Sequence, residues 1–108
     1  MITILPNKAV SDRVLFEMKE NDDVLGSVSG VIDGDTITIS ELDSVEEIFY
    51  DGLVRAILAY ADNRFVKKAV FAIDDDRKLY RLKGFGFITE ESNILTDIQA
   101  FFKEDSCG

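Results

Sequence analysis

The chain has 108 residues, 46% of them hydrophobic, which predicts one globular domain with a single hydrophobic core. Its net charge of -9 argues against a nucleic-acid or anionic-membrane surface, and the absence of histidine excludes catalysis or metal binding through imidazole. A single cysteine, Cys107, cannot form an internal disulfide, and with the lack of a membrane-length apolar run it predicts a cytoplasmic protein. An exposed thiol could still pair between chains, and no metal site is predicted.

The first forty residues alternate apolar and polar side chains at the two-residue period of β-strands. Asp33-Gly34 separates the last two strands and is favoured in two-residue hairpin turns, because both central positions of such turns need positive φ. Gly26 and Gly30 lie inside the preceding strand and favour a β-bulge or close backbone packing there, with a ligand contact as the alternative. The predicted strands are residues 1–5, 13–19, 24–32 and 36–40.

A long apolar helix is predicted to follow, beginning at about Val45. Ser44 and Glu47 have the Ser-x-x-Glu spacing of a capping box, in which a hydroxyl and a carboxylate bind free backbone N–H groups at a helix start. Asp51 and Arg55 are four residues apart with the acid first, the order that favours an ion pair. The polar residues of this helix form only a narrow strip along it, so we expect the helix to be buried over most of its circumference.

The second half of the chain alternates strands and helices. Acidic residues at its start, basic residues toward its end and Gly84 at a left-handed cap position predict a short helix over residues 75–83. Thr96 and Gln99 have the spacing of another capping box, which predicts a C-terminal helix. We also expect strands over residues 67–73 and 85–89, docking of Ile98, Phe101 and Phe102 on the core, and fraying of the last five residues.

The segment "KLYRLKGFGF" contains the pattern Leu-Tyr-x-x-x-Gly-Phe at Leu79, Tyr80, Gly84 and Phe85. This pattern resembles the segment with which members of the GNAT superfamily of acyl-CoA-dependent N-acyltransferases finish, a helix followed by a strand. The order of an antiparallel meander, a long helix and a strand is also similar to that family. The resemblance covers about residues 24–88. It implies a single-domain α+β fold with a mixed, mostly antiparallel sheet and a long central helix.

The resemblance also directs attention to the start of the long helix. In the family a glycine-rich turn there binds the CoA pyrophosphate through bare backbone N–H groups. In this sequence only Gly52 is nearby, and Glu46, Glu47 and Asp51 surround the same helix start. Each carboxylate at about 5 Å from a pyrophosphate would cost from under about 1 to a few kcal/mol, depending on the local dielectric. We therefore expect acetyl-CoA, the implied cosubstrate, to bind weakly or not at all.

Two interpretations of this helix start remain. In one, the segment begins a self-capped core helix that has lost the CoA binding typical of the family. In the other, the loop is altered so that Tyr50 stacks on or beside the cofactor and Arg55 or Lys67 neutralises it. The candidate cofactor contacts are Tyr50, Asp51, Gly52, Leu53 and Arg55.

Two catalytic candidates follow from the resemblance. Tyr80 matches the family tyrosine that protonates the departing CoA thiolate, and its alternative role is an aromatic residue at the edge of the core. Glu41 lies on the strand where some members carry a carboxylate base, and its alternative is a solvated residue at a strand end. The asparagine often found seven residues before the tyrosine is replaced by Ile73. An active enzyme would acylate a primary amine.

The leading hypothesis is therefore a GNAT-like N-acyltransferase superfamily member with a degenerate pyrophosphate-binding loop. The alternative is a non-catalytic GNAT-fold module that binds a protein partner or itself, as a homodimer, through an exposed strand edge or the C-terminal helix. The helix start favours the module, and the Leu-Tyr-Gly-Phe segment favours the enzyme. Neither hypothesis includes nucleic acid, a membrane or a metal ion as a partner.

Overall fold

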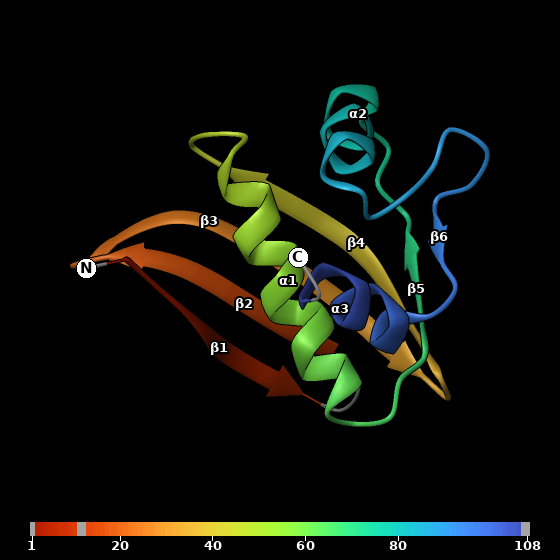
Figure 1. Cartoon of the computed structure of the whole chain (residues 1–108). Coiled ribbons are helices and arrows are strands. Elements are labelled where there is room, and N and C mark those ends of the chain that lie inside the picture. The colour runs from red at the N-terminus through yellow and green to blue at the C-terminus, as the bar shows by residue number, and fades with distance from the viewer. Residues whose placement is uncertain (1, 11–12, 107–108) are drawn as a thin grey trace.

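A six-stranded sheet is the framework of the structure, a computed structural model that describes the backbone of residues 2–10 and 13–106. The strands lie in chain order across the sheet, and neighbours are antiparallel except for β4 and β5, which are parallel (Figure 1). The pairing of edge strand β1 with β2 shifts register between Pro6 and Lys8. The strands are β1 Ile2–Val10, β2 Arg13–Glu20, β3 Asp23–Asp33, β4 Thr36–Ser44, β5 Lys68–Phe71 and β6 Ile94–Leu95.

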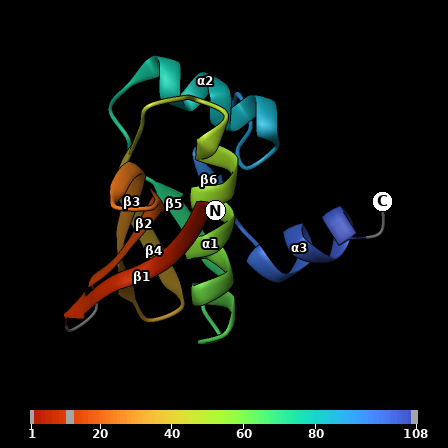
Figure 2. The same ribbon diagram turned by 90° about the vertical axis from the view of Figure 1, so that its left-hand side faces the viewer.

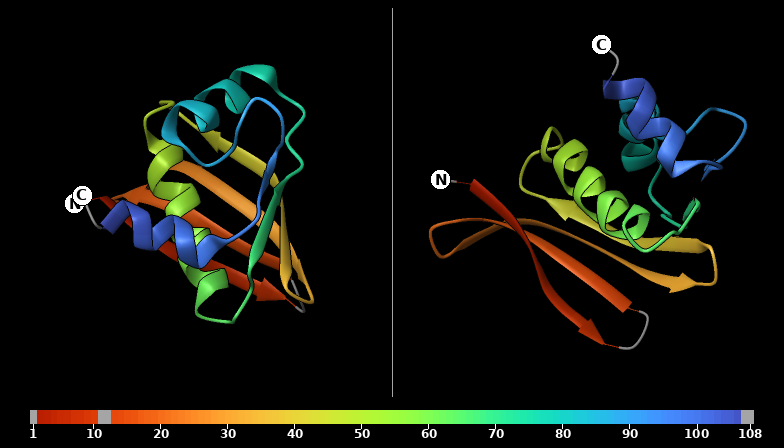
Figure 3. Two further views of the ribbon diagram at one scale, coloured as in Figure 1. Left: turned by 45° about the vertical axis from the view of Figure 1, so that its right-hand side comes forward. Right: turned by 60° about the horizontal axis from the view of Figure 1, so that its bottom comes forward.

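The helices are α1 Phe49–Asp62, α2 Asp76–Phe85 and α3 Ile98–Ser106. Helix α1 packs on one face of the sheet, α3 lies beside it on the same side, and α2 lies across one end of the sheet (Figures 2 and 3). The core lies between α1 and the sheet, where Val28, Ile37 and Ile57 are fully buried. The predicted α+β domain with a mixed, mostly antiparallel sheet and a long central helix is confirmed. None of the helices within the described residues is long and apolar enough to span a membrane.

The predicted hairpin between β3 and β4 is confirmed, but its turn lies one residue later than predicted. Asp33 pairs with Thr36, so Gly34 and Asp35 form the loop. Gly34 alone of these two has a positive φ, 62°. Glycine at the first loop position suffices for such a turn.

The prediction of a bulge or close backbone packing at the two glycines of β3 is confirmed. The β3–β4 register shifts between Ser29 and Gly30, which marks a bulge. A Cβ atom on Gly26 would lie 2.7 Å from the Cβ of Ser44 and 2.9 Å from Cδ1 of Leu53. The backbone of β3 therefore approaches both β4 and α1 more closely than a side chain would allow.

Helix α1 begins at Phe49 rather than at about Val45, and the predicted capping box is wrong. Ser44 is still part of β4, and the N–H of Val45 extends the ladder by donating to the carbonyl of Leu25 at 2.8 Å. The N-cap is Ile48, which makes no side-chain cap hydrogen bond. Strand pairing holds this segment extended and overrides the local capping signal.

Helix α2 runs through Gly84 and ends at Gly86, which has a φ of 91°. Gly84 is therefore not the cap, and no strand forms over residues 85–89; the short β6 follows instead. Ending the helix at the second of the two Gly-Phe pairs buries Phe87 almost completely. Core packing thus selects between two local signals that the sequence leaves equivalent.

Helix α3 begins after Asp97, whose side chain accepts a hydrogen bond from the N–H of Ala100 at 3.0 Å. The cap is therefore Asp97 rather than Thr96. Docking of this helix is confirmed, because Ile98 is fully buried and both phenylalanines that follow pack against the core. The helix extends to Ser106, into the segment where fraying is predicted. Residues 107–108, including Cys107, lie outside the described residues.

Candidate functional site

Strands β4 and β5 run side by side for only four residue pairs and then separate. The pairs run from Thr36–Lys68 to Ile39–Phe71, and the last link is the N–H of Ala72, which donates to the carbonyl of Ile39 at 2.8 Å. Strand β4 then continues along β3 for five more residues, while the chain after β5 leads into α2. We call this separation the fork. Helix α2 and the start of helix α1 both lie at the open end of the fork (Figure 1).

The five predicted cofactor contacts all lie in the first two turns of α1, so the structure brings them together. Tyr50 and Leu53 are buried in the core, whereas Asp51 and Gly52 are half-buried. The predicted ion pair is confirmed, with 2.9 Å between Nε of Arg55 and Oδ1 of Asp51. The guanidinium group of Arg55 also lies over the rings of Phe87 and Phe101, at 5.7 and 5.3 Å from their centroids.

The phenol of Tyr50 lies in an acidic environment at the fork. Burial is the main cause that raises the pKa of Tyr50, because it disfavours the phenolate. The carboxylates of Asp43, at the end of β4, and Asp75, just before α2, raise this pKa further, as does Glu47. Arg77 opposes them in part. The hydroxyl therefore stays protonated at neutral pH.

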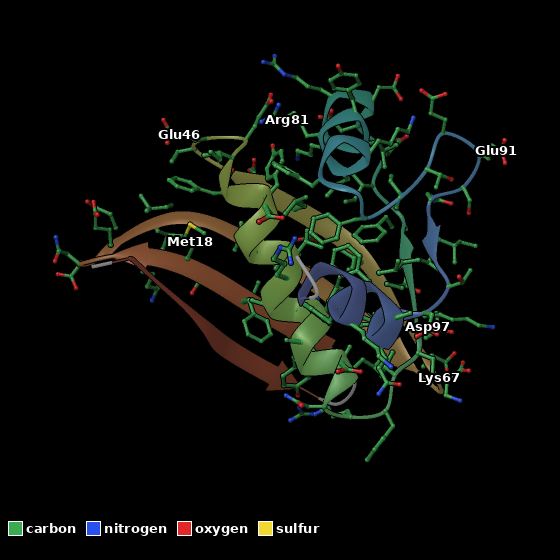
Figure 4. All side chains as sticks on the ribbon, viewed as in Figure 1. Met18, Glu46, Lys67, Arg81, Glu91 and Asp97 are labelled. Carbon is green, nitrogen blue, oxygen red and sulfur yellow. The ribbon has the colours of Figure 1, made fainter. Side chains whose placement is uncertain are left out.

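Glu47, in the connection between β4 and α1, is held by two arginines of α2. Its Oε1 accepts a hydrogen bond from Nε of Arg77, and its Oε2 lies 3.2 Å from Nε of Arg81. A further pair joins Asp43 to Lys78, with 4.0 Å between the charged atoms. Figure 4 shows Arg81 between α2 and this connection. One of the three acids expected to repel a pyrophosphate, Glu47, is therefore paired with two arginines.

These arginines are functional candidates that sequence reasoning missed. Arg77 and Arg81 are four residues apart, so they share one face of α2, and this spacing is visible in the sequence. Their partner is not, because Glu47 precedes Arg77 by thirty residues. The start of α1 also differs from the prediction, since no side-chain oxygen caps it. Its first two N–H groups, those of Phe49 and Tyr50, instead donate to the carbonyls of Glu46 and Glu47 at 3.1 and 3.0 Å.

The two predicted catalytic residues are not brought together. Glu41 lies on the sheet face opposite α1 and pairs with Arg13, with 3.4 Å between their charged atoms. Tyr80 lies on α2 and is 72% exposed. It lines a cleft of about 390 Å³ between α2 and the following loop, together with Lys83 and Glu90 among others. The catalytic roles of Tyr80 and Glu41 stay predictions.

The actual end of α2 also changes the spacing of the Leu-Tyr-x-x-x-Gly-Phe pattern. Tyr80 stands four residues before Gly84, but four residues before the true cap, Gly86, stands Leu82. Leu82 is fully buried and cannot donate a proton. Lys67, the other cation considered for the cofactor, lies beyond the far end of α1 from the fork (Figure 4).

No protein-family model matches the sequence, and no curated protein matches it. Among solved structures, the chain is similar to the solution NMR structure of "Putative N-Acetyl Transferase YhhK" from E. coli bound to coenzyme A. The identity is 15%, the match covers 84% of this chain and 76% of that chain, and the TM-score is 0.58. The chain has a GNAT-like fold. The fold that the resemblance implies is thus confirmed. The helix after β5 nevertheless ends at Gly86 and not at Gly84, the glycine of the Leu-Tyr-x-x-x-Gly-Phe pattern. Among the side chains that the structure describes, those of residues 13–103, no group of acidic residues is arranged to hold a metal ion.

Proposed function

We propose that this chain binds CoA or acetyl-CoA weakly, at the fork, as a GNAT-fold protein with a degenerate pyrophosphate-binding loop. The separation of two parallel strands beside the start of α1 carries this proposal. The backbone of β4 beyond Ile39 has β3 on one side and no longer pairs with β5 on the other. Peptide groups along such an edge can hydrogen-bond the amides of an extended ligand arm. The similar structure, which is bound to coenzyme A, supports the same ligand class.

Three features make the expected binding weak. The loop before α1 lacks the glycines that allow a main chain to approach phosphates. The buried ring of Tyr50 and the carboxylate of Asp43 lie close to the path of such a ligand. Glu47 already pairs with Arg77 and Arg81, which are therefore not free to bind the phosphates. We therefore expect a dissociation constant near about 1 mM, or about 4 kcal/mol of binding free energy.

A bound acyl-CoA would donate its acyl group to a primary amine. The amine nitrogen forms a bond to the thioester carbonyl carbon, the carbon–sulfur bond breaks, and CoA leaves as a thiol once its sulfur is protonated. Tyr80 is the proposed proton donor. Water is the proposed base, since Glu41 lies on the opposite face of the sheet.

Thermal unfolding with acetyl-CoA tests this proposal. At a dissociation constant of about 1 mM, about 5 mM ligand adds about 1 kcal/mol of stability. For a domain of this size the midpoint should rise by about 4–8 °C. ATP at the same concentration shares the adenine and phosphates but lacks the pantetheine arm, so it should raise the midpoint much less. An equal response to both nucleotides, or none to acetyl-CoA, would contradict binding at the fork.

A second proposal, from another functional class, is a non-catalytic module that binds a second copy of itself. No helix of the described part of the chain covers the sheet face opposite α1 (Figure 2). Open faces of antiparallel sheets are usually polar, yet three of four cross-strand neighbours here are apolar, and we call these four residues the apolar row. This row consists of Val31, Thr38, Val70 and Ile94, of which Val31 and Ile94 are 43% and 42% exposed.

The charges around the apolar row favour a second copy as the occupant. Arg13, Glu41 and Lys68 flank it, so two copies related by a two-fold axis can place opposite charges together. The net charge of the whole chain, -9, opposes self-association through other surfaces. The C-terminal helix considered for this role is instead docked, because Phe101 and Phe102 pack on the core.

Sedimentation velocity tests the second proposal. We expect a concentration-dependent dimer for the natural chain and a monomer for Val31→Lys, because a charge in the apolar row would be buried without a partner. Val24→Lys is the matched control, since Val24 is 48% exposed, close to the 43% of Val31, but lies at the start of β3, outside the row. A natural chain that stays monomeric at every concentration would rule this proposal out.

A further inference from the structure

Helix α2 is attached to the rest of the domain by few buried side chains and by a set of ion pairs. Among its ten residues only Leu82 is fully buried, whereas α1 buries six. Leu79 and Phe85 are partly buried against the core. The ion pairs of α2, by contrast, all lead to the two acids that flank the fork, Asp43 and Glu47. These carboxylates therefore contribute to holding α2 over the fork, together with the buried Leu82.

The contact at Glu47 is geometrically incomplete. Two guanidinium groups converge on one carboxylate, which provides one negative charge for two positive ones. Nε of Arg81 is buried and lies 3.2 Å from the carboxylate, yet it is not aligned for a hydrogen bond and has no hydrogen-bond partner in the structure. A diphosphate has more charge and more acceptor oxygens, and guanidinium groups bind phosphate oxygens in pairs.

We propose that Arg77 and Arg81 form an anion site for the diphosphate of a CoA-class ligand, and that Glu47 occupies this site in the free protein as an internal competitor. A diphosphate displaces the carboxylate and takes over both guanidinium groups. This inference rests on the proposed function for the identity of the ligand. The ionic attachment of α2 through Glu47 does not depend on it.

Binding measurements distinguish Glu47 as a competitor from Glu47 as a simple surface residue. Glu47→Gln frees both arginines and removes a charge that repels the ligand, so inorganic pyrophosphate and acetyl-CoA should each bind about tenfold more tightly. Arg81→Gln should weaken the binding of both, by a similar factor. Glu91→Gln, an exposed position in the loop before β6, makes the same chemical change away from the fork (Figure 4) and should alter neither affinity.

Hydrogen exchange provides a readout that needs no ligand. Because either substitution removes an ion pair, Glu47→Gln and Arg81→Gln should both accelerate amide exchange in α2 by about two- to fivefold, relative to amides in the centre of α1. High salt should reduce the difference from the natural chain. The two substitutions thus act in the same direction on exchange and in opposite directions on affinity, which a general loss of folding would not reproduce.

Each outcome supports or overturns the inference. If Glu47→Gln exchanges no faster in α2 than Glu91→Gln, the ionic attachment is wrong. If acetyl-CoA binds the natural chain and Glu47→Gln equally, the competitor role is wrong while the proposed function stands. If pyrophosphate binds Glu47→Gln but acetyl-CoA does not, the anion site stands and the proposed function fails. If neither ligand binds any variant, both are wrong.

Discussion

Replacement of Phe87 by alanine should lower the free energy of unfolding by about 3–5 kcal/mol, because it leaves a ring-sized cavity in the core. Phe87 is 1% exposed and follows the cap of α2. Its ring lies 5.0 Å from that of Phe101 and 6.4 Å from that of Phe71, so one side chain connects α2, α3 and β5. Urea unfolding followed by circular dichroism measures the change.

Phe65→Ala is the matched control for this substitution. Phe65 is 88% exposed, so the same truncation should change stability by less than about 0.5 kcal/mol. Its positive φ of 64° is equally strained with either side chain and therefore cancels from the comparison. If Phe87→Ala costs no more than the control, α2 does not end at Gly86 in the way that buries this ring.

The second large effect is expected at Gly26. Alanine there should destabilise the domain by about 2–3 kcal/mol, because overpacking displaces backbone as well as side chains. Its Cβ would lie 2.7 Å from the Cβ of Ser44, 2.8 Å from the carbonyl oxygen of Asp43 and 2.9 Å from Leu53. A carbonyl oxygen within a sheet cannot move aside as the end of a side chain can. Relief therefore requires that β3 and β4 separate.

The glycines of α2 give two matched substitutions with opposite expected signs. Gly84 lies in the helix with open space around it, so Gly84→Ala should stabilise the domain by about 0.5–1 kcal/mol. Gly86 has a φ of 91°, so Gly86→Ala should destabilise it by about 1 kcal/mol. Thermal unfolding of both variants locates the cap directly. Reversed signs would mean that the helix ends at Gly84, as the sequence alone predicts.

Much of the fold could be predicted because its signals are local. Alternating side chains locate the strands of the meander, and a glycine-containing turn locates the β3–β4 hairpin. The spacing of Asp51 and Arg55 predicts their ion pair because a helix brings such residues together wherever it lies. These features depend on a few consecutive residues and need no knowledge of the rest of the chain.

The errors arise where distant contacts outweigh a local signal. Ser44 has the spacing of a cap, yet pairing with β3 keeps it in a strand. The choice between Gly84 and Gly86 is made by the burial of Phe87. The two arginines at the fork were missed for the same reason, since Glu47 lies far from Arg77 and Arg81 in the sequence and meets them only in the fold.

The irregular edge strand β1 affects whether two molecules of this protein can pair their strands edge to edge. Strand β1 changes register between Pro6 and Lys8, and proline has no N–H group to offer. A strand arriving from another molecule therefore finds two short straight runs instead of one continuous template. Four consecutive antiparallel strands rich in alternating apolar residues would otherwise be prone to polymerise. We therefore expect the interruption at Pro6 to disfavour growth into fibrils at this edge.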